Sequence, residues 1–143
     1  MCFLSMAHLL RCCLTLLVQI LVPNYPPISV QTLVDPGASD SFLDPSIFSN
    51  HHLHPIPHLH PIPLELIYGH TPSTSPITHY FLARLRIHAT HTETHTFQVT
   101  KLASFRLVLG FPWVARHNPR IDWQHGTLTF ASPLCSSTCL SPP

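Results

Sequence analysis

The sequence predicts an all-β domain with one short helix close to its C-terminus. Sixteen prolines and only four glycines in 143 residues argue against long helices and favour short strands joined by extended segments. Several short runs alternate apolar and polar residues, which is typical of strands with one buried face. Apolar residues make up 45% of the chain and charged residues only 9%, so the chain can bury a core and is not expected to be disordered.

The first two strands are predicted at residues 15–22 and 28–34, and we expect them to form a hairpin. In the first strand, every second residue from Leu14 to Ile20 is apolar and falls on one face. The connecting segment "PNYPP" is rich in turn-forming residues. The second strand leads into Asp35, which begins the tight loop "DPGAS". This arrangement presents a single carboxylate at the end of a strand.

Residues 1–13 are predicted to be a leader, either unstructured or signal-like, and residues 141–143 a tail. The uncharged stretch at residues 12–22 is shorter than the roughly 20 apolar residues that span a bilayer, so no membrane association is expected. Arg11 interrupts the apolar run and no charged start precedes it, which argues against a signal peptide. A cytoplasmic location is therefore expected, and a cleaved signal sequence is the alternative.

A histidine- and proline-rich repeat follows. The six letters "HLHPIP" at residues 52–57 recur unchanged at residues 58–63. Such proline density excludes a helix and a central strand, and it favours an extended connector of the polyproline II type. We therefore predict that residues 51–63 are an insert in a loop. Metal binding by these histidines is the alternative, but a flexible tract lacks the outer contacts that fix ligands, so any affinity should be weak.

A second hairpin is predicted between residues 79 and 99. Alternate residues from Phe81 to Ala89 are apolar and face one way. The segment "THTETHTFQV" continues as the second strand, with Thr, His and Glu93 at the intervening turn.

The remaining elements are short. Residues 106–110, "RLVLG", predict a strand buried on both faces. Pro112 then begins a helix of one or two turns, which "HNP" ends. The segments "IDW" and "TLTFAS" close the domain as strands around a "QHG" turn. Trp113 and Trp123 are expected to be core aromatics.

The charge pattern excludes some partners. The formal net charge is only +1, and the seven Lys and Arg residues are few and scattered. A phosphate-binding surface needs clustered cations, so no nucleic-acid partner is expected.

The cysteines lie only at the two ends of the chain, and their odd number argues against a disulfide framework. They are Cys2, Cys12, Cys13, Cys135 and Cys139. The spacing of the last two could hold two metal ligands, but no matching Cys or His pair follows nearby. No metal site is therefore predicted, and buried or idle thiols are expected.

Several motifs together carry a family resemblance. Two apolar residues before Asp-x-Gly-Ala-Ser, and the later apolar-apolar-Gly before a short helix, resemble the retropepsin-type aspartic protease domain. The segment "LVLGFPWVARHNPRIDWQHGTLTF" followed by "CSSTCL" is similar to the protease segment of gypsy-type LTR retrotransposon polyproteins, and of host genes derived from them. "ITHY" and the following "H.E...F.VT" pattern fit as well. The resemblance covers about residues 14–140 and implies a closed, retropepsin-like β-barrel.

This resemblance also implies a function. Each chain would supply one catalytic aspartate, Asp35, and two chains would meet to cleave a polypeptide without a cofactor. Gly37 would bring its N–H close to the carboxylate, and Ala38 would stay small beneath the loop. The flap, the hairpin that closes over substrate, would include Tyr68 and Gly69.

Pro36 departs from the family pattern. In the family, Ser or Thr stands between Asp and Gly, and its hydroxyl bonds to the opposite loop across the dimer axis. Pro36 has neither a hydroxyl nor an N–H. We expect the fold to survive and activity to be weakened. The alternative is a catalytically silent, domesticated domain that acts in dimerisation or protein binding.

Overall fold

The computed structural model describes residues 14–50, 52–63 and 75–140. The predicted leader at 1–13, the tail at 141–143 and the predicted flap residues Tyr68 and Gly69 lie outside these residues.

The first hairpin is present as predicted. Strand β1 (Leu14–Leu21) pairs antiparallel with β2 (Ile28–Val34), in a register that joins Leu14 to Val34. Alternate residues of β1 are buried, because the apolar positions repeat every two residues and one face of a strand must face the core. The second strand therefore ends where the sequence places Asp35.

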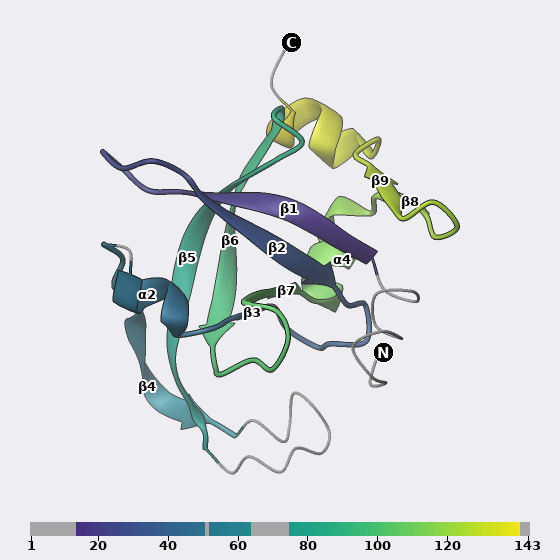
Figure 1. Ribbon diagram of the computed structural model, residues 1–143. Coiled ribbons are helices and arrows are strands. Elements are labelled where there is room, and N and C mark those ends of the chain that lie inside the picture. The colour runs from purple at the N-terminus through teal and green to yellow at the C-terminus, as the bar shows by residue number, and fades with distance from the viewer. Residues whose placement is uncertain (1–13, 51, 64–74, 141–143) are drawn as a thin grey trace.

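The main sheet closes into a barrel (Figure 1). Its seven described strands are ordered β1-β2-β7-β3-β6-β5-β4, and β1 also pairs with β5. That pairing leaves β4 outside a closed ring of six strands. The further barrel strands are β3 (Phe42–Leu43), β5 (Ile77–Ile87), β6 (His91–Val99) and β7 (Leu107–Leu109). The prediction of an all-β barrel is confirmed.

The second hairpin, β5–β6, is also confirmed, with two local corrections. Leu85 and Ile87 are fully buried, but Ala89 is exposed, because the chain already turns at His88 and Ala89 with positive φ angles of 53° and 60°. Glu93 is not in the turn. It lies on β6 and is buried.

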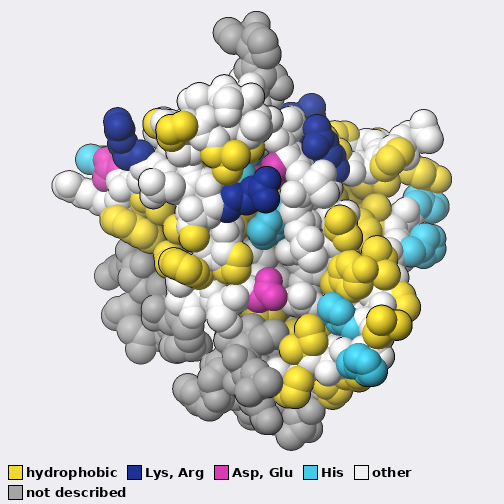
Figure 2. All heavy atoms as spheres, turned by 180° about the vertical axis from the view of Figure 1, so that it is seen from behind, with side chains coloured by type: hydrophobic (Ala, Val, Ile, Leu, Met, Phe, Trp, Pro, Cys, Tyr) yellow, Lys and Arg dark blue, Asp and Glu magenta, His cyan; other side chains and the backbone are white. Residues whose placement is uncertain are grey.

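Residues 56–62 of the histidine- and proline-rich repeat form a strand, whereas the repeat was predicted to be a loop insert. Strand β4 (Ile56–Ile62) pairs antiparallel with β5, with an irregular register between Pro57 and Ile62. Prolines are tolerated there because β4 is an edge strand, and only one side of it needs backbone donors. From behind, hydrophobic and histidine side chains gather on the side of the molecule where β4 lies (Figure 2). Leu59, 96% exposed, belongs to this strand.

The predicted short helix is present as α4 (Phe111–His117), with Pro112 in its first turn and Asn118 ending it in the left-handed conformation. Two other helical segments were not predicted. They are α2 (Ser46–Asn50) and a single turn of π-helix, η1 (Cys135–Cys139). Both are too short to show a helical period in the sequence. No helix among the described residues is long and apolar enough to cross a membrane.

The two tryptophans differ. Trp113 on α4 is fully buried in the main core, as predicted. Trp123 is 55% exposed, so its expected place in the core is wrong. It follows the short strand β8 (Arg120–Asp122), which pairs only with β9 (Thr127–Thr129) in a separate two-stranded sheet. Trp123 lies in the turn between these two strands.

Candidate active site

Asp35 is positioned by a parallel strand pair. Strand β2 runs parallel to β7, with Val34 opposite Leu109. The N–H of Asp35 continues this ladder by donating to the carbonyl of Leu109 at 2.9 Å. The side chain of Asp35 is half-buried at the end of β2, beside the barrel.

The loop after Asp35 is held by its own backbone. The N–H of Gly37 donates to Asp35 Oδ1 at 2.9 Å, and the N–H of Ala38 donates to the Asp35 carbonyl at 3.1 Å. Ala38 is buried, whereas Pro36 is exposed. The proline fits because Asp35 ends a strand, and a residue before proline prefers extended backbone.

A second segment locks this loop in place. The N–H of Phe111, at the start of α4, donates to the carbonyl of Ala38 at 2.8 Å. The N–H of Gly110 donates to Ser41 Oγ at 3.0 Å, and Ser41 Oγ also lies 2.9 Å from His95 Nε2. The turn from β7 into α4 therefore supports both ends of the Asp35 loop.

Three other described acids also accept hydrogen bonds from nearby groups, but they lie outside the β2–β7 pair. Asp40 Oδ1 accepts the N–H of Ser41, and the buried Asp44 accepts the N–H groups of Ser46 and Leu102. Asp122 lies 2.7 Å from His125 on an exposed turn. Among the described acids, Asp35 is the one that directly follows β2 and lies beside the turn from β7 into α4.

A hollow of about 490 Å³ lies elsewhere, beside the β1–β2 connection. Tyr25, His52 and Arg106 are among its lining residues, and the loop from Asp35 to Ala38 does not contribute to it. Asp35 therefore lies outside this hollow.

The structure also contains a buried polar cluster that sequence reasoning missed. Glu93 accepts hydrogen bonds from His91 Nε2 at 2.5 Å, His117 Nε2 at 2.9 Å and the indole Nε1 of Trp113 at 3.0 Å. Burial alone would raise the pKa of Glu93. The hydrogen bonds from His117, His91 and Trp113 instead lower it to about 2.

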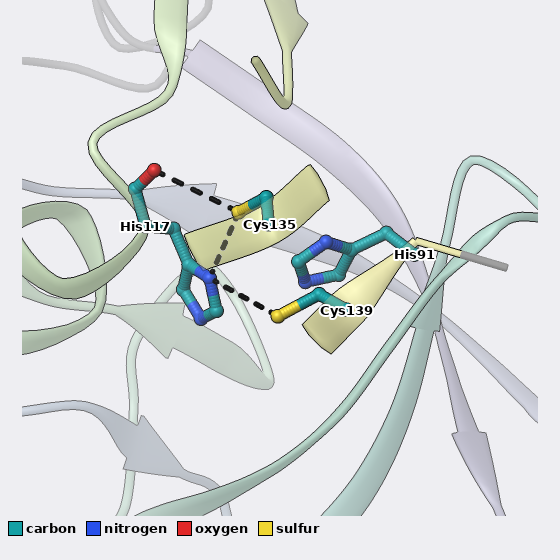
Figure 3. Close-up of side chains that lie close together, drawn as sticks. All are labelled: His91, His117, Cys135 and Cys139. Carbon is teal, nitrogen blue, oxygen red and sulfur yellow. Dashed lines mark hydrogen bonds between the residues drawn. The ribbon is translucent and has the colours of Figure 1, made fainter. Parts of the chain in front are cut away.

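Two cysteines complete the cluster (Figure 3). Cys135 Sγ lies 3.3 Å and Cys139 Sγ 3.9 Å from His117 Nδ1, and both cysteines are buried. Burial raises the pKa of the Cys135 thiol, which does not suit a nucleophile. The two histidines precede the cysteines in the sequence, in "HTE" and "RHNP", and no Cys or His pair follows them.

Known proteins share this fold. The crystal structure of the retroviral protease-like domain of Ddi1 from Leishmania major is similar in fold, with a TM-score of 0.54 at 18% sequence identity. The match covers 82% of this chain and 86% of that chain. The closed barrel is that of a retropepsin-like protease domain. Residues 31–139 match the family model of the PEG10/RTL1 protease domain, and the chain belongs to this retrotransposon-derived family.

Proposed function

We propose that the chain is one half of a homodimeric aspartic endopeptidase, in which two copies of Asp35 meet across a two-fold axis. One observation carries this proposal. A single half-buried carboxylate ends β2, and the N–H of Gly37 holds its Oδ1 on a loop that α4 supports. One carboxylate per chain is half of what the chemistry requires.

Two carboxylates are needed because like charges a few ångströms apart cannot both ionise, so the pair shares one proton. The ionised Asp35 takes a proton from a water held between the two. The protonated Asp35 donates a hydrogen bond to the scissile carbonyl. The two groups titrate as a unit, and neither chain alone has the pair.

Pro36 weakens this arrangement. A Ser or Thr hydroxyl at that position would bond across the dimer axis, and each such bond is worth about 1 kcal/mol net. Two chains lose two bonds, and a displaced carboxylate lowers the rate further. We therefore propose a slow peptidase whose Asp35 loop keeps its local hydrogen bonds.

A second candidate function also depends on Pro36. If Pro36 leaves the two carboxylates out of register, the domain is catalytically silent and acts in dimerisation or protein binding. The missing hydroxyl at the exposed Pro36 is the observation that favours this candidate over an active peptidase.

We also propose a gypsy-type origin and a polyprotein as the ancestral substrate. The proposal rests on the "LGFPW", "HNP" and "IDW" motifs. A cytoplasmic location is part of the same proposal.

The test compares three proteins in one assay: the parent chain, Asp35→Asn and Pro36→Ser. A peptide library at acidic pH should be cleaved slowly by the parent, and a pepstatin-like inhibitor should stop cleavage. Asp35→Asn should have no activity. Pro36→Ser should be about 10- to 100-fold faster, since it restores roughly two hydrogen bonds per dimer.

Sedimentation of the same proteins, combined with their activities, separates the two candidates. All three should form dimers. An inactive parent dimer that Pro36→Ser makes active identifies the silent form. A parent that stays monomeric at every concentration, or an Asp35→Asn variant that still cleaves, contradicts the endopeptidase.

A further inference from the structure

Four buried side chains bring their metal-binding atoms to one point. His91 comes from the start of β6, His117 from the end of α4, and Cys135 and Cys139 from η1 (Figure 3). Their ligand atoms all lie within 4.8 Å of one another. Three segments far apart in the chain thus converge on a set of two sulfurs and two nitrogens.

The spacing suits a small tetrahedral ion. Zinc binds nitrogen at about 2.0–2.1 Å and sulfur at about 2.3 Å, which separates tetrahedral ligands by roughly 3.3–3.8 Å. His117 Nδ1 lies 3.3 Å from Cys135 Sγ and 3.9 Å from Cys139 Sγ. Small side-chain rotations would bring the widest pair into the same range.

Glu93 orients both imidazoles for this role. Its carboxylate only accepts hydrogen bonds, so the Nε2 atoms of His91 and His117 must both carry protons. In the neutral rings the lone pairs then lie on the two Nδ1 atoms. A carboxylate that fixes the far nitrogen of a metal-bound histidine is the usual outer partner at zinc sites.

One of these two lone pairs has no hydrogen-bond donor facing it in the described part of the chain. His91 Nδ1 is buried and has no hydrogen-bond partner among the described residues. Buried polar atoms are nearly always satisfied, so an unpaired one calls for an explanation. The second unusual feature is the π-helical turn, closed by the N–H of Leu140 on the Cys135 carbonyl, which leaves both thiols buried.

We propose that His91, His117, Cys135 and Cys139 bind one structural Zn²⁺. Binding displaces the two thiol protons, so the ion and its two thiolates are together neutral beside the Glu93 carboxylate. Two sulfurs with two nitrogens in tetrahedral arrangement select zinc over the oxygen-preferring ions. All four ligands come from the chain and are buried, so the site is closed and structural.

The ion would tie the end of the domain to the barrel. Leu140 pairs with His91 through an isolated bridge, and α4 begins where its backbone supports the Asp35 loop. Zinc would therefore hold η1, α4 and β6 together. Loss of the metal should loosen the C-terminal turn first.

The first experiment measures zinc by mass spectrometry in the full chain, after equilibration with zinc and dialysis against a mild competing chelator. The parent should retain one zinc per chain. Cys139→Ser should retain less than one tenth of that amount. Two matched variants, Cys13→Ser and His60→Gln, should retain the zinc fully, because neither residue is a proposed ligand. They serve as controls for the N-terminal thiols and for the histidine- and proline-rich repeat.

Substitution of cobalt for zinc in the parent chain gives a readout that does not depend on whether any variant folds. The parent should show the visible bands of tetrahedral cobalt and a charge-transfer band from two thiolates. Cys139→His should keep the visible bands and halve the charge-transfer intensity. A folded parent that takes up no zinc, zinc that is lost in Cys13→Ser but kept in Cys139→Ser, or a Cys135–Cys139 disulfide in reducing buffer would overturn the proposal.

Discussion

Gly110 approaches Asp40 so closely that a Cβ atom on Gly110 would stand 2.0 Å from the Asp40 carbonyl oxygen. The same atom would lie 2.9 Å from the carbonyl oxygen of Ala38. These neighbours are backbone atoms and cannot rotate away. The φ angle of Gly110 is −90°, so space rather than conformation requires glycine here. The backbones of the Asp35 loop and of the start of α4 are therefore in direct van der Waals contact at this point.

Gly110→Ala should therefore lower the free energy of unfolding by about 3 kcal/mol, because an added methyl group forces two backbone segments apart. Urea denaturation at fixed protein concentration measures the loss. Gly126→Ala is the control, since a Cβ there meets nothing within 4 Å, although its φ of +66° costs about 1 kcal/mol. Any peptidase activity should fall only in Gly110→Ala. Equal losses in the two variants would contradict the packing argument.

Ser41→Ala removes the shared partner of Gly110 and His95. Ser41 is fully buried, so its loss leaves the Gly110 N–H without an acceptor. We expect the free energy of unfolding to fall by about 1–3 kcal/mol. Ser29→Ala, at an exposed position of β2, should change it by less than about 0.5 kcal/mol. A comparable loss in both would show that the Ser41 hydroxyl is not needed.

Two acid–histidine pairs allow a matched test of burial. Glu93→Gln keeps the size of the side chain but replaces the carboxylate with an uncharged amide. The NH₂ group of that amide is a donor, so it cannot accept the N–H groups that point at Glu93. Breaking a buried pair of this kind should cost about 3–5 kcal/mol in unfolding free energy. Asp122→Asn, beside the exposed His125, should cause no measurable change, since water screens that pair. Similar losses in the two variants would be incompatible with a buried charge at Glu93.

The strands could be predicted because their signal is local. Alternation of apolar residues in β1 and β5 depends only on which face of a strand is buried, and each segment carries that pattern alone. The place of Asp35 followed from the same reasoning, since β2 ends one residue before it. The contact between Gly110 and Asp40 could not be predicted, because it depends on how two distant turns meet.

The buried cluster was hidden for the same reason. Glu93 sits among Thr and His residues that indicate a solvent-facing turn, and only closure of the barrel buries it. His117 and the two cysteines come from separate segments. The prediction that the repeat is a loop insert was wrong for a different reason. Proline excludes a central strand, but an edge strand needs backbone donors on one side only.

Asp44 should make the stability of the domain depend on pH. Burial by itself would raise its pKa, but the N–H groups of Leu102 and Ser46, with the charge of Lys101, lower it below the ordinary value of 3.8. A lowered pKa means that the folded state prefers the ionised form. The stabilisation is therefore complete above the ordinary pKa and is lost as the pH falls through the lowered value.

Asp44→Asn should consequently lower the free energy of unfolding by about 1–3 kcal/mol at pH 7, since a neutral amide accepts more weakly. As the pH falls through the lowered pKa of Asp44, the parent carboxyl becomes protonated, so the two proteins should converge. Lys101→Gln is the control, because the charge of Lys101 is the smallest cause of the lowered Asp44 pKa. Its free energy of unfolding should follow that of the parent at every pH. A difference between Asp44→Asn and the parent that stays constant from pH 7 to pH 2 would mean that shape, and not charge, gives Asp44 its effect.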